Sequence, residues 1–166
     1  MEEGEKLVKL LKIDDYYYIG FALLMAALVL ALIPRTAIRK LFGFSLVWGY
    51  LGSFSFVNFL GEGILNLFSW NEADPFIFIK TPFLLNLAWA PAVMIYLYFV
   101  PKPKHLFYLY FLSFTLISAG LDEVFHRLGL LRYIFWNPFF RFIVAFLWLY
   151  GVTWHAEKIN LFEEIR

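Results

Sequence analysis

The stretch GLDEVFHRLGLLRYIFWNP, residues 120–138, decides the fold, because it lies between two long apolar segments and carries many ionisable groups. The apolar segment before it begins at Leu106. A helix needs about 20 residues, at about 1.5 Å each, to cross the hydrocarbon of a bilayer. Counted from Leu106, such a helix ends near Phe125 and carries Asp122 and Glu123 in its last turn. The stretch therefore predicts a membrane-spanning helix with a charged end.

The composition of the 166-residue chain is typical of a membrane protein, since 62% of its residues are apolar and 22% are aromatic. Soluble domains are about 45–50% apolar, and the excess here is arranged in blocks. The net charge of +1 gives no basic surface for nucleic acid. Because the chain has no cysteine, disulfides, thiolate metal sites and cysteine nucleophiles are excluded.

The apolar blocks predict an all-α polytopic membrane protein of five transmembrane helices, with no β-sheet. Residues 1–15, where lysines recur at every third position among leucines, are expected to form an amphipathic helix on the membrane surface. The transmembrane domain is expected at residues 16–154, followed by a polar tail at 155–166. The expected spans are about 16–33, 41–60, 82–100, 106–125 and 138–154.

Prolines and small residues indicate how the spans begin, end and pack. Pro34 is expected to end the first span before a basic loop at residues 35–40. Asn137 as N-cap, with Pro138 at the first helical position, is a strong start signal for the fifth span. A patch of small residues in the second span would let another helix approach closely. Its members are Gly49, Gly52 and Ser53.

The short loops indicate the orientation of the chain. Two of them are basic and fall on one side of the membrane, whereas the loop that carries Glu72 and Asp74 is acidic. By the positive-inside rule the basic loops are cytoplasmic, so the N-terminus is expected outside and the C-terminus inside. The basic residues are Arg35, Arg39, Lys40, Lys102 and Lys104.

The second and fourth spans end in similar sequences, GEGILNLFSWN and DEVFHRLGLLRYIFWN. Each has an acid at the end of a span, then an amphipathic stretch, then Trp-Asn before the next span. The pattern suits a parallel repeat in which helices two and three correspond to helices four and five. Glu62 and Glu123 would then be counterparts. Chance similarity in an aromatic-rich sequence is the alternative.

Polar residues from four spans are expected at one depth near the outer interface. Polar groups at such a depth are costly unless they face protein or water, so they predict an outer-facing polar pocket. The alternative is an amphipathic extension of the fourth span with solvated charges. The sharpest expectation is that Glu62 and Glu123 approach each other across the second and fourth helices, with Arg141 and His126 nearby. The candidate binding residues are Asn58, Glu62, Asn86, Asp122, Glu123, His126 and Arg141.

No metal or cofactor is predicted. Glu123 and His126 have the spacing of one half of a carboxylate-bridged metal site. The other histidines, His105 and His155, fall on the opposite side of the membrane, so a second pair of ligands cannot converge. The sequence contains no phosphate-binding loop, dinucleotide fingerprint or nucleophile elbow. The six tryptophans lie mostly near predicted span ends and are interpreted as interface anchors.

The stretch GLLRYIFWN resembles a family of uncharacterised, very hydrophobic small membrane proteins of spore-forming Gram-positive bacteria. The family carries a Gly-Leu-Leu-x-Tyr-x-x-Trp-Asn-like stretch before its last span. The resemblance implies a bacterial plasma-membrane location but no known activity, and Asn86 stands where the family often has an acid. The matching residues are Gly129, Leu130, Leu131, Tyr133, Trp136 and Asn137.

The chain is also similar, more weakly, to the small membrane subunits of carotenoid (lycopene) cyclases. Those proteins place a Trp-Asn-like loop before a proline that opens a span and is followed by paired acids. Here Pro82 is followed by FLLN, so the resemblance does not supply the acids that proton transfer needs.

Three functions follow as hypotheses. The first is binding or passage of a small solute, ion or lipid at the outer-facing pocket. The second is a non-enzymatic assembly subunit that packs against other membrane proteins or forms a homo-oligomer. The third is an intramembrane enzyme for a lipid or isoprenoid, with Glu62 or Glu123 as proton donor. The lipid bilayer is an expected partner in each case.

Overall fold

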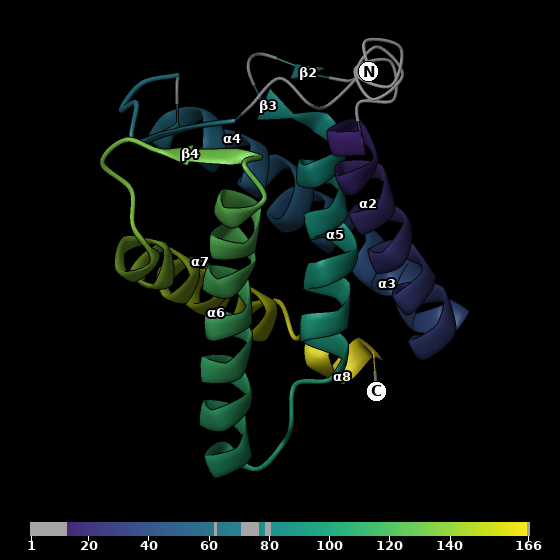
Figure 1. Ribbon diagram of the computed structural model, residues 1–166. Coiled ribbons are helices and arrows are strands. Elements are labelled where there is room, and N and C mark those ends of the chain that lie inside the picture. Colours follow the sequence, from purple (N-terminus) through teal and green to yellow (C-terminus); the bar gives the residue numbers. More distant parts are fainter. Residues whose placement is uncertain (1–12, 62, 71–76, 79–80, 166) are drawn as a thin grey trace, which may run out of the picture.

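The computed structural model describes residues 13–61, 63–70, 77–78 and 81–165, and these residues are mostly helical (Figure 1). The predicted surface helix at residues 1–15 lies largely outside the described part of the chain. The helices are α2 (Ile13–Leu32), α3 (Arg35–Ser45), the π-helical segment η1 (Leu46–Leu51), α4 (Gly52–Leu60), α5 (Phe83–Tyr98), α6 (Lys104–Arg127), α7 (Pro138–Lys158) and α8 (Leu161–Ile165). The strands are β1 (Phe68–Trp70), β2 (Ile77–Phe78), β3 (Thr81–Pro82) and β4 (Leu131–Tyr133).

Three helices of the described chain are long and apolar enough to cross a membrane. They are α6, α7 and the continuous helix Arg35–Leu60, which joins α3, η1 and α4. The apolar helices at Tyr17–Leu32 and Phe83–Tyr98 are shorter. Helices therefore form at each of the five apolar blocks, and membrane-spanning length is shown for three of them.

The expectation that the protein has no β-sheet is wrong. β1 pairs with β4 in an antiparallel ladder, in which Phe68 lies opposite Tyr133 and Trp70 lies opposite Leu131. β2 pairs with β3 in a second short ladder. Backbone N–H and C=O groups next to a hydrocarbon layer need partners, and the segments after α4 and α6 find them in each other. The two similar sequences noted above thus lie side by side.

Helix α6 ends at Arg127, two residues beyond the expected end of the fourth span at Phe125. Gly129 has a φ of 75°, in the left-handed region. Its N–H bonds the carbonyl of His126 at 3.0 Å, and the N–H of Leu130 bonds the carbonyl of Phe125 at 2.9 Å. This pair of bonds is a Schellman motif, which satisfies the last carbonyls of a helix and reverses the chain. The chain can then return as β4.

We expect Gly129→Ala to lower the free energy of unfolding by about 1–2 kcal/mol, because a Cβ disfavours the left-handed conformation. Gly120→Ala is the matched control, since a Cβ at Gly120 meets no atom within 4 Å and the residue lies within helix α6. That change should raise stability by about 0.5–1 kcal/mol. Reversible unfolding in detergent micelles, followed by circular dichroism, measures both. Equal effects at the two positions would contradict the left-handed turn.

The segments predicted to be a basic loop and a polar C-terminal tail also differ from expectation. The predicted loop at residues 35–40 is helical, because Pro34 occupies the N-cap position of α3 and only a two-residue break separates α3 from α2. The predicted polar tail is partly helical and packed. Leu161 and Ile165 of α8 are buried in the core, and the Lys40 ammonium donates a hydrogen bond to the Glu164 carbonyl. An amphipathic turn with two apolar residues on one side explains this packing.

The core consists of two hydrophobic clusters. One joins α3, α5, α7 and α8 through buried residues such as Leu41, Leu97 and Val152. The other lies beneath the β1–β4 ladder and contains Phe68, Leu131 and other aromatic and aliphatic side chains. α7 crosses behind α6 at a marked inclination in Figure 1. The cavity described below is lined by residues from both clusters.

Candidate functional site: an aromatic-lined cavity with a buried ion pair

A cavity lies among α4, α5, α6, α7 and β1, with about 50 Å³ of space open to water-sized molecules. A single water needs about 10–15 Å³ by this measure, so the cavity accepts a group of a few heavy atoms. Its polar lining comes from Ser53, Asp122 and Arg141. The remaining lining is aromatic or apolar and consists of Phe56, Val57, Phe68, Trp70, Trp89, Trp136, Val144 and Trp148.

The ion pair in this cavity joins α6 to α7. Arg141 Nε lies 2.9 Å from Asp122 Oδ2, and the two side chains are only 11% and 13% exposed. Arg141 Nη2 also donates a hydrogen bond to Ser118 Oγ at 2.9 Å. The guanidinium carbon lies 5.6 Å from the centre of the Trp89 ring, which adds a cation–π contact. Arg141 is thereby held by groups from two other helices.

The start of α7 places Arg141 at the cavity. Asn137 Oδ1 accepts a hydrogen bond from the Phe140 N–H at 3.0 Å, and Pro138 is the first residue of the helix. The predicted N-cap is therefore confirmed. Arg141 follows in the first turn, with its own N–H bonded to the Asn137 carbonyl at 3.0 Å. The chain segment that leads into α7 contributes Trp136, whose Nε1 donates to Asp122 Oδ2 at 3.4 Å.

Ser53 and Asn86 connect α4 to α5 beside the cavity. Ser53 Oγ donates to Asn86 Oδ1 at 2.7 Å, and Asn86 Nδ2 donates to the Pro82 carbonyl at 3.0 Å. Both side chains are buried. Asn86 does not line the cavity, but its side chain fixes the orientation of the Ser53 hydroxyl that does.

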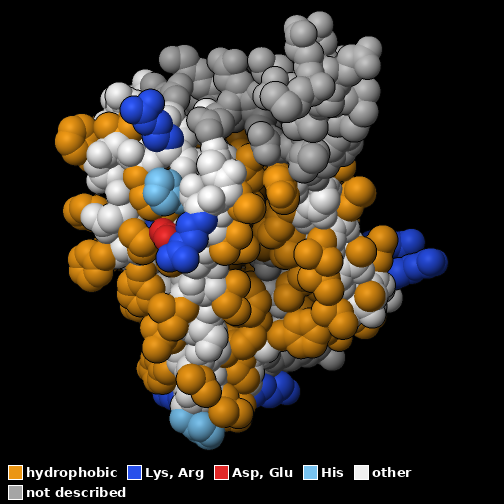
Figure 2. Space-filling view, in the orientation of Figure 1, with side chains coloured by type: hydrophobic (Ala, Val, Ile, Leu, Met, Phe, Trp, Pro, Cys, Tyr) orange, Lys and Arg blue, Asp and Glu red, His pale blue; other side chains and the backbone are white. Residues whose placement is uncertain are grey.

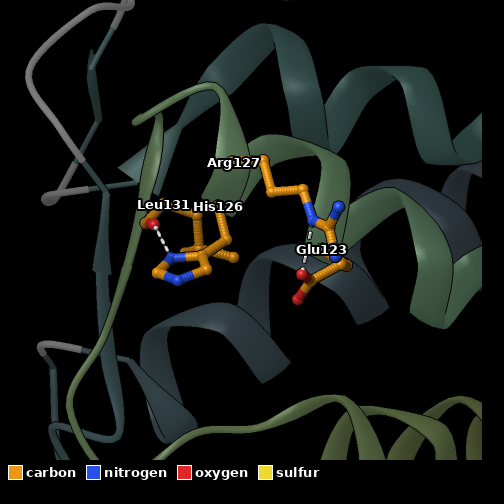
Figure 3. A network of polar contacts seen from close by, with 4 residues as sticks. All are labelled: Glu123, His126, Arg127 and Leu131. Atoms are coloured by element: carbon orange, nitrogen blue, oxygen red, sulfur yellow. Dashed lines mark hydrogen bonds and ion pairs between the residues drawn. The ribbon is translucent and has the colours of Figure 1, made fainter.

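Glu123 and His126 lie away from the cavity, at the end of α6 (Figure 3). Glu123 Oε1 forms an ion pair with Arg127 Nε at 2.8 Å, in which the Arg127 side chain is 78% exposed. His126 Nδ1 donates to the Leu131 carbonyl at 2.9 Å, and its ring stacks on Tyr133 with centroids 4.0 Å apart. His126 therefore contacts the backbone and a side chain of β4.

The phenol of Tyr133 lies in a strongly perturbed environment. Burial, together with the negative charges of Asp122 and Glu123, raises the pKa of Tyr133 to about 12. The tyrosine remains neutral throughout the physiological pH range.

Two of the predicted binding residues, Asp122 and Arg141, line the cavity, and Asn86 reaches it through Ser53. Asn58 instead donates from Nδ2 to the Phe54 carbonyl of its own helix at 2.8 Å. Glu62 lies outside the described residues, and so does its expected approach to Glu123.

The tryptophans of the cavity were not expected from the sequence. Interface anchoring does not describe Trp89 and Trp148, which lie well inside α5 and α7 and meet edge to face with centroids 5.5 Å apart. Their position away from the helix ends is the signal that could have identified them, since anchors belong at the ends. Trp70 reaches the cavity from strand β1, and Trp136 reaches it from the segment between β4 and α7.

Two indole N–H groups on these side chains are buried and have no hydrogen-bond partner among the described residues. They are Trp70 Nε1 and Trp148 Nε1. A buried donor that lacks a partner costs about 1–3 kcal/mol, so such groups mark places where a partner is expected.

The described residues contain no group of three histidine, aspartate or glutamate side chains that could hold a metal ion. Comparisons of the chain with protein-family models, curated protein sequences and solved structures found no match.

Proposed function

We propose that the chain is a multi-pass membrane protein that binds a small molecule, or the polar end of a lipid, in the cavity among α4, α5, α6 and α7. The observation that carries the proposal is the combination of the buried Asp122–Arg141 pair with mostly aromatic walls. Ligand sites are usually apolar cavities with a few precisely placed polar groups, and an ionisable residue within spanning helices marks a functional site by default.

The surface of the helices supports a membrane location. Large apolar side chains are exposed along α2, α6 and α7, including Leu30, Ile117 and Leu147 at 74%, 59% and 62% exposure. Figure 2 shows hydrophobic side chains over much of one face of the described residues, with one group of charged side chains within that face and the others toward its edges. Exposed apolar surface of this extent needs an apolar partner, which the lipid bilayer provides.

The positive-inside rule supports an outward-facing cavity. α6 begins at Lys104, beside Lys102, and Asp122 lies near its opposite end. Arg35, Arg39 and Lys40 similarly precede Ser53 along the continuous helix Arg35–Leu60. With the basic ends of these helices in the cytoplasm, the cavity faces the outside.

Binding is better supported than passage or catalysis. A cavity of about 50 Å³ holds a small group but gives no continuous path. Of the two acids suggested as proton donors, Glu123 pairs with Arg127 near the surface and does not line the cavity.

A second candidate function is assembly with another membrane protein. A groove of about 460 Å³ lies between α6 and α7, and its lining is aromatic and aliphatic apart from a few polar groups. An apolar groove, together with a Glu123 side chain that pairs with the exposed Arg127 and does not line the cavity, is the arrangement expected of an assembly subunit. The groove is lined by Phe107, Tyr108, Phe111, Leu112, Phe146, Tyr150, Thr153, Trp154 and Glu157.

Native mass spectrometry of the protein in mild detergent tests ligand binding. We expect an added mass on the wild-type protein that Val144→Phe loses, because Val144 lines the cavity and a larger side chain fills it. Val124→Phe is the matched control, since Val124 is 49% exposed on α6, and it should keep the added mass. A wild-type protein with no added mass, or retention in Val144→Phe, would count against the cavity. A stable dimer or larger oligomer in the same spectra would favour the assembly function.

A further inference from the structure

The α7 side of the groove between α6 and α7 is an aromatic stripe that leads to a lysine. Phe146, Tyr150 and Trp154 line the groove at every fourth position, and Lys158 is the next residue in that series. Residues four apart lie on the same face of a helix. The Lys158 ammonium lies 5.1 Å from the centre of the Trp154 ring, which is a cation–π contact. This contact holds Lys158 at the end of the groove.

The α6 side of the groove also follows a lysine. Lys104 is the first residue of α6, and it precedes Phe107 and Tyr108 of the lining by three and four positions. Lys104 therefore lies on the face of α6 that forms the groove, and it is exposed. Figure 2 shows basic side chains at the end of the molecule where α6 begins in Figure 1. One end of the groove thus carries a lysine from each helix.

The length of the groove matches one leaflet of a bilayer. The lining covers residues 107–112 of α6 and 146–157 of α7, which is about 16 Å along α7 at about 1.5 Å per residue. The hydrocarbon core of a bilayer is about 30 Å thick. At the far end of the groove from the lysines, the Phe111 and Phe146 rings meet edge to face with centroids 5.0 Å apart. A lipid chain from one leaflet fits this length, whereas a spanning helix of a partner would extend well beyond it.

The charges at the lysine end favour an anion. Lys104 and Lys158 together outweigh the negative charge of Glu157, which also lines the groove. In the orientation proposed above, this end lies at the cytoplasmic leaflet. Basic pockets between spanning helices on the cytoplasmic side bind the headgroups of anionic lipids.

We infer that the groove between α6 and α7 binds an anionic phospholipid of the cytoplasmic leaflet. One acyl chain lies along the aromatic stripe of α7, and the headgroup phosphate lies near Lys104 and Lys158. The apolar lining contacts the chain, and the two lysines select the negative headgroup. The inference rests on the membrane location and orientation proposed above, and it does not depend on a ligand in the cavity that holds the Asp122–Arg141 pair.

Native mass spectrometry of the full chain in an uncharged detergent compares phosphatidylglycerol with phosphatidylcholine, both carrying the same acyl chains. We expect phosphatidylglycerol to bind about 5-fold more tightly, the preference that one net positive charge gives near an anionic headgroup. Lys104→Gln and Lys158→Gln should each lower this ratio to about 1. Arg39→Gln changes the net charge equally on the exposed surface of α3, outside the groove, and should leave the ratio unchanged.

Glu157→Gln tests the same charges with the opposite sign. Because it removes the negative charge of the lining, it should raise the preference for phosphatidylglycerol to about 25-fold. Glu163→Gln is the matched control, since Glu163 is exposed on α8 and does not line the groove. A gain of binding cannot result from unfolding of the variant.

A larger side chain within the groove tests the position of the acyl chain. Leu112→Trp should lower the retention of both lipids, because Leu112 lines the groove. Ile117→Trp is the control, since Ile117 is exposed on α6 and does not line the groove. Val144→Phe, which fills the other cavity, should leave the retention of phosphatidylglycerol unchanged.

The outcomes separate this inference from the proposed function. Equal retention of the two lipids, or a preference that both lysine variants keep, overturns the inference and leaves the lysines as interface anchors only. A dimer that Leu112→Trp dissociates, without retained lipid, makes the groove a protein interface instead. Retention of phosphatidylglycerol that Val144→Phe abolishes and Leu112→Trp does not would place the lipid in the cavity, so the proposed function would stand and the inference would fail. Lipid lost in Leu112→Trp, with no mass that Val144→Phe removes, would give the reverse result.

Discussion

Arg141→Met is expected to lower the free energy of unfolding by about 3–5 kcal/mol, the cost typical of removing one partner from a buried ion pair. Among the described residues, the Asp122 carboxylate, at 13% side-chain exposure, would keep only the long 3.4 Å hydrogen bond from Trp136. The Ser118 hydroxyl oxygen would also lose the hydrogen bond that it accepts from Arg141 Nη2. Reversible unfolding in mixed micelles, monitored by tryptophan fluorescence, measures the loss.

Arg127→Met is the matched control for this prediction. Arg127 pairs with Glu123 at nearly the same distance, 2.8 Å, but its side chain is 78% exposed. An exposed pair of this kind contributes about 0.5 kcal/mol or less. In the double variant Asp122→Leu with Arg141→Met the uncompensated charge is absent, so much of the stability should return. Equal effects of the two single arginine variants would show that the buried pair has no special role.

The sequence predicts those features that neighbouring residues determine. Asn137 and Pro138 define the start of α7 through a bond from the Phe140 N–H to the Asn137 side chain, three residues away. The apolar blocks likewise locate helices at each predicted span, since hydrophobicity over about 20 residues is a local property. Such signals require no knowledge of which helices become neighbours.

The features that the sequence does not predict depend on distant partners. Asp122 and Glu123 are adjacent and chemically alike, yet the position of Arg141 on another helix brings only Asp122 into the cavity. The β1–β4 ladder joins Phe68 to Tyr133 across 65 positions, and each strand has only three residues, too few to show an alternating pattern.

The small-residue patch of the second span is an intermediate case, because the sequence indicates a close approach without identifying the partner. The partner is α5. A Cβ built on Gly49 would lie 2.5 Å from the Ala90 Cα and 2.6 Å from the Trp89 carbonyl oxygen. Both are backbone atoms, so they cannot move aside as a side chain can. The contact falls within the π-helical segment η1, and such segments are frequent at functional sites.

Gly49→Ala is therefore expected to destabilise the protein by about 1–3 kcal/mol or more, since extra volume at a close-packed contact has to displace a helix. Gly43→Ala is the control, because a Cβ at Gly43 meets no atom within 4 Å and the residue lies in α3 of the same continuous helix. That change should add about 0.5–1 kcal/mol of stability. Unfolding in mixed micelles compares the two variants directly.

The same substitution should also weaken ligand retention, because the backbone of α5 that it displaces carries Trp89. Trp89 lines the cavity and lies against the Arg141 guanidinium. Native mass spectrometry of Gly49→Ala, at a temperature where the variant remains folded, should show less bound mass than Gly43→Ala. If Gly49→Ala were as stable as Gly43→Ala and retained as much ligand, then α5 could not approach the second span as closely as the structure shows.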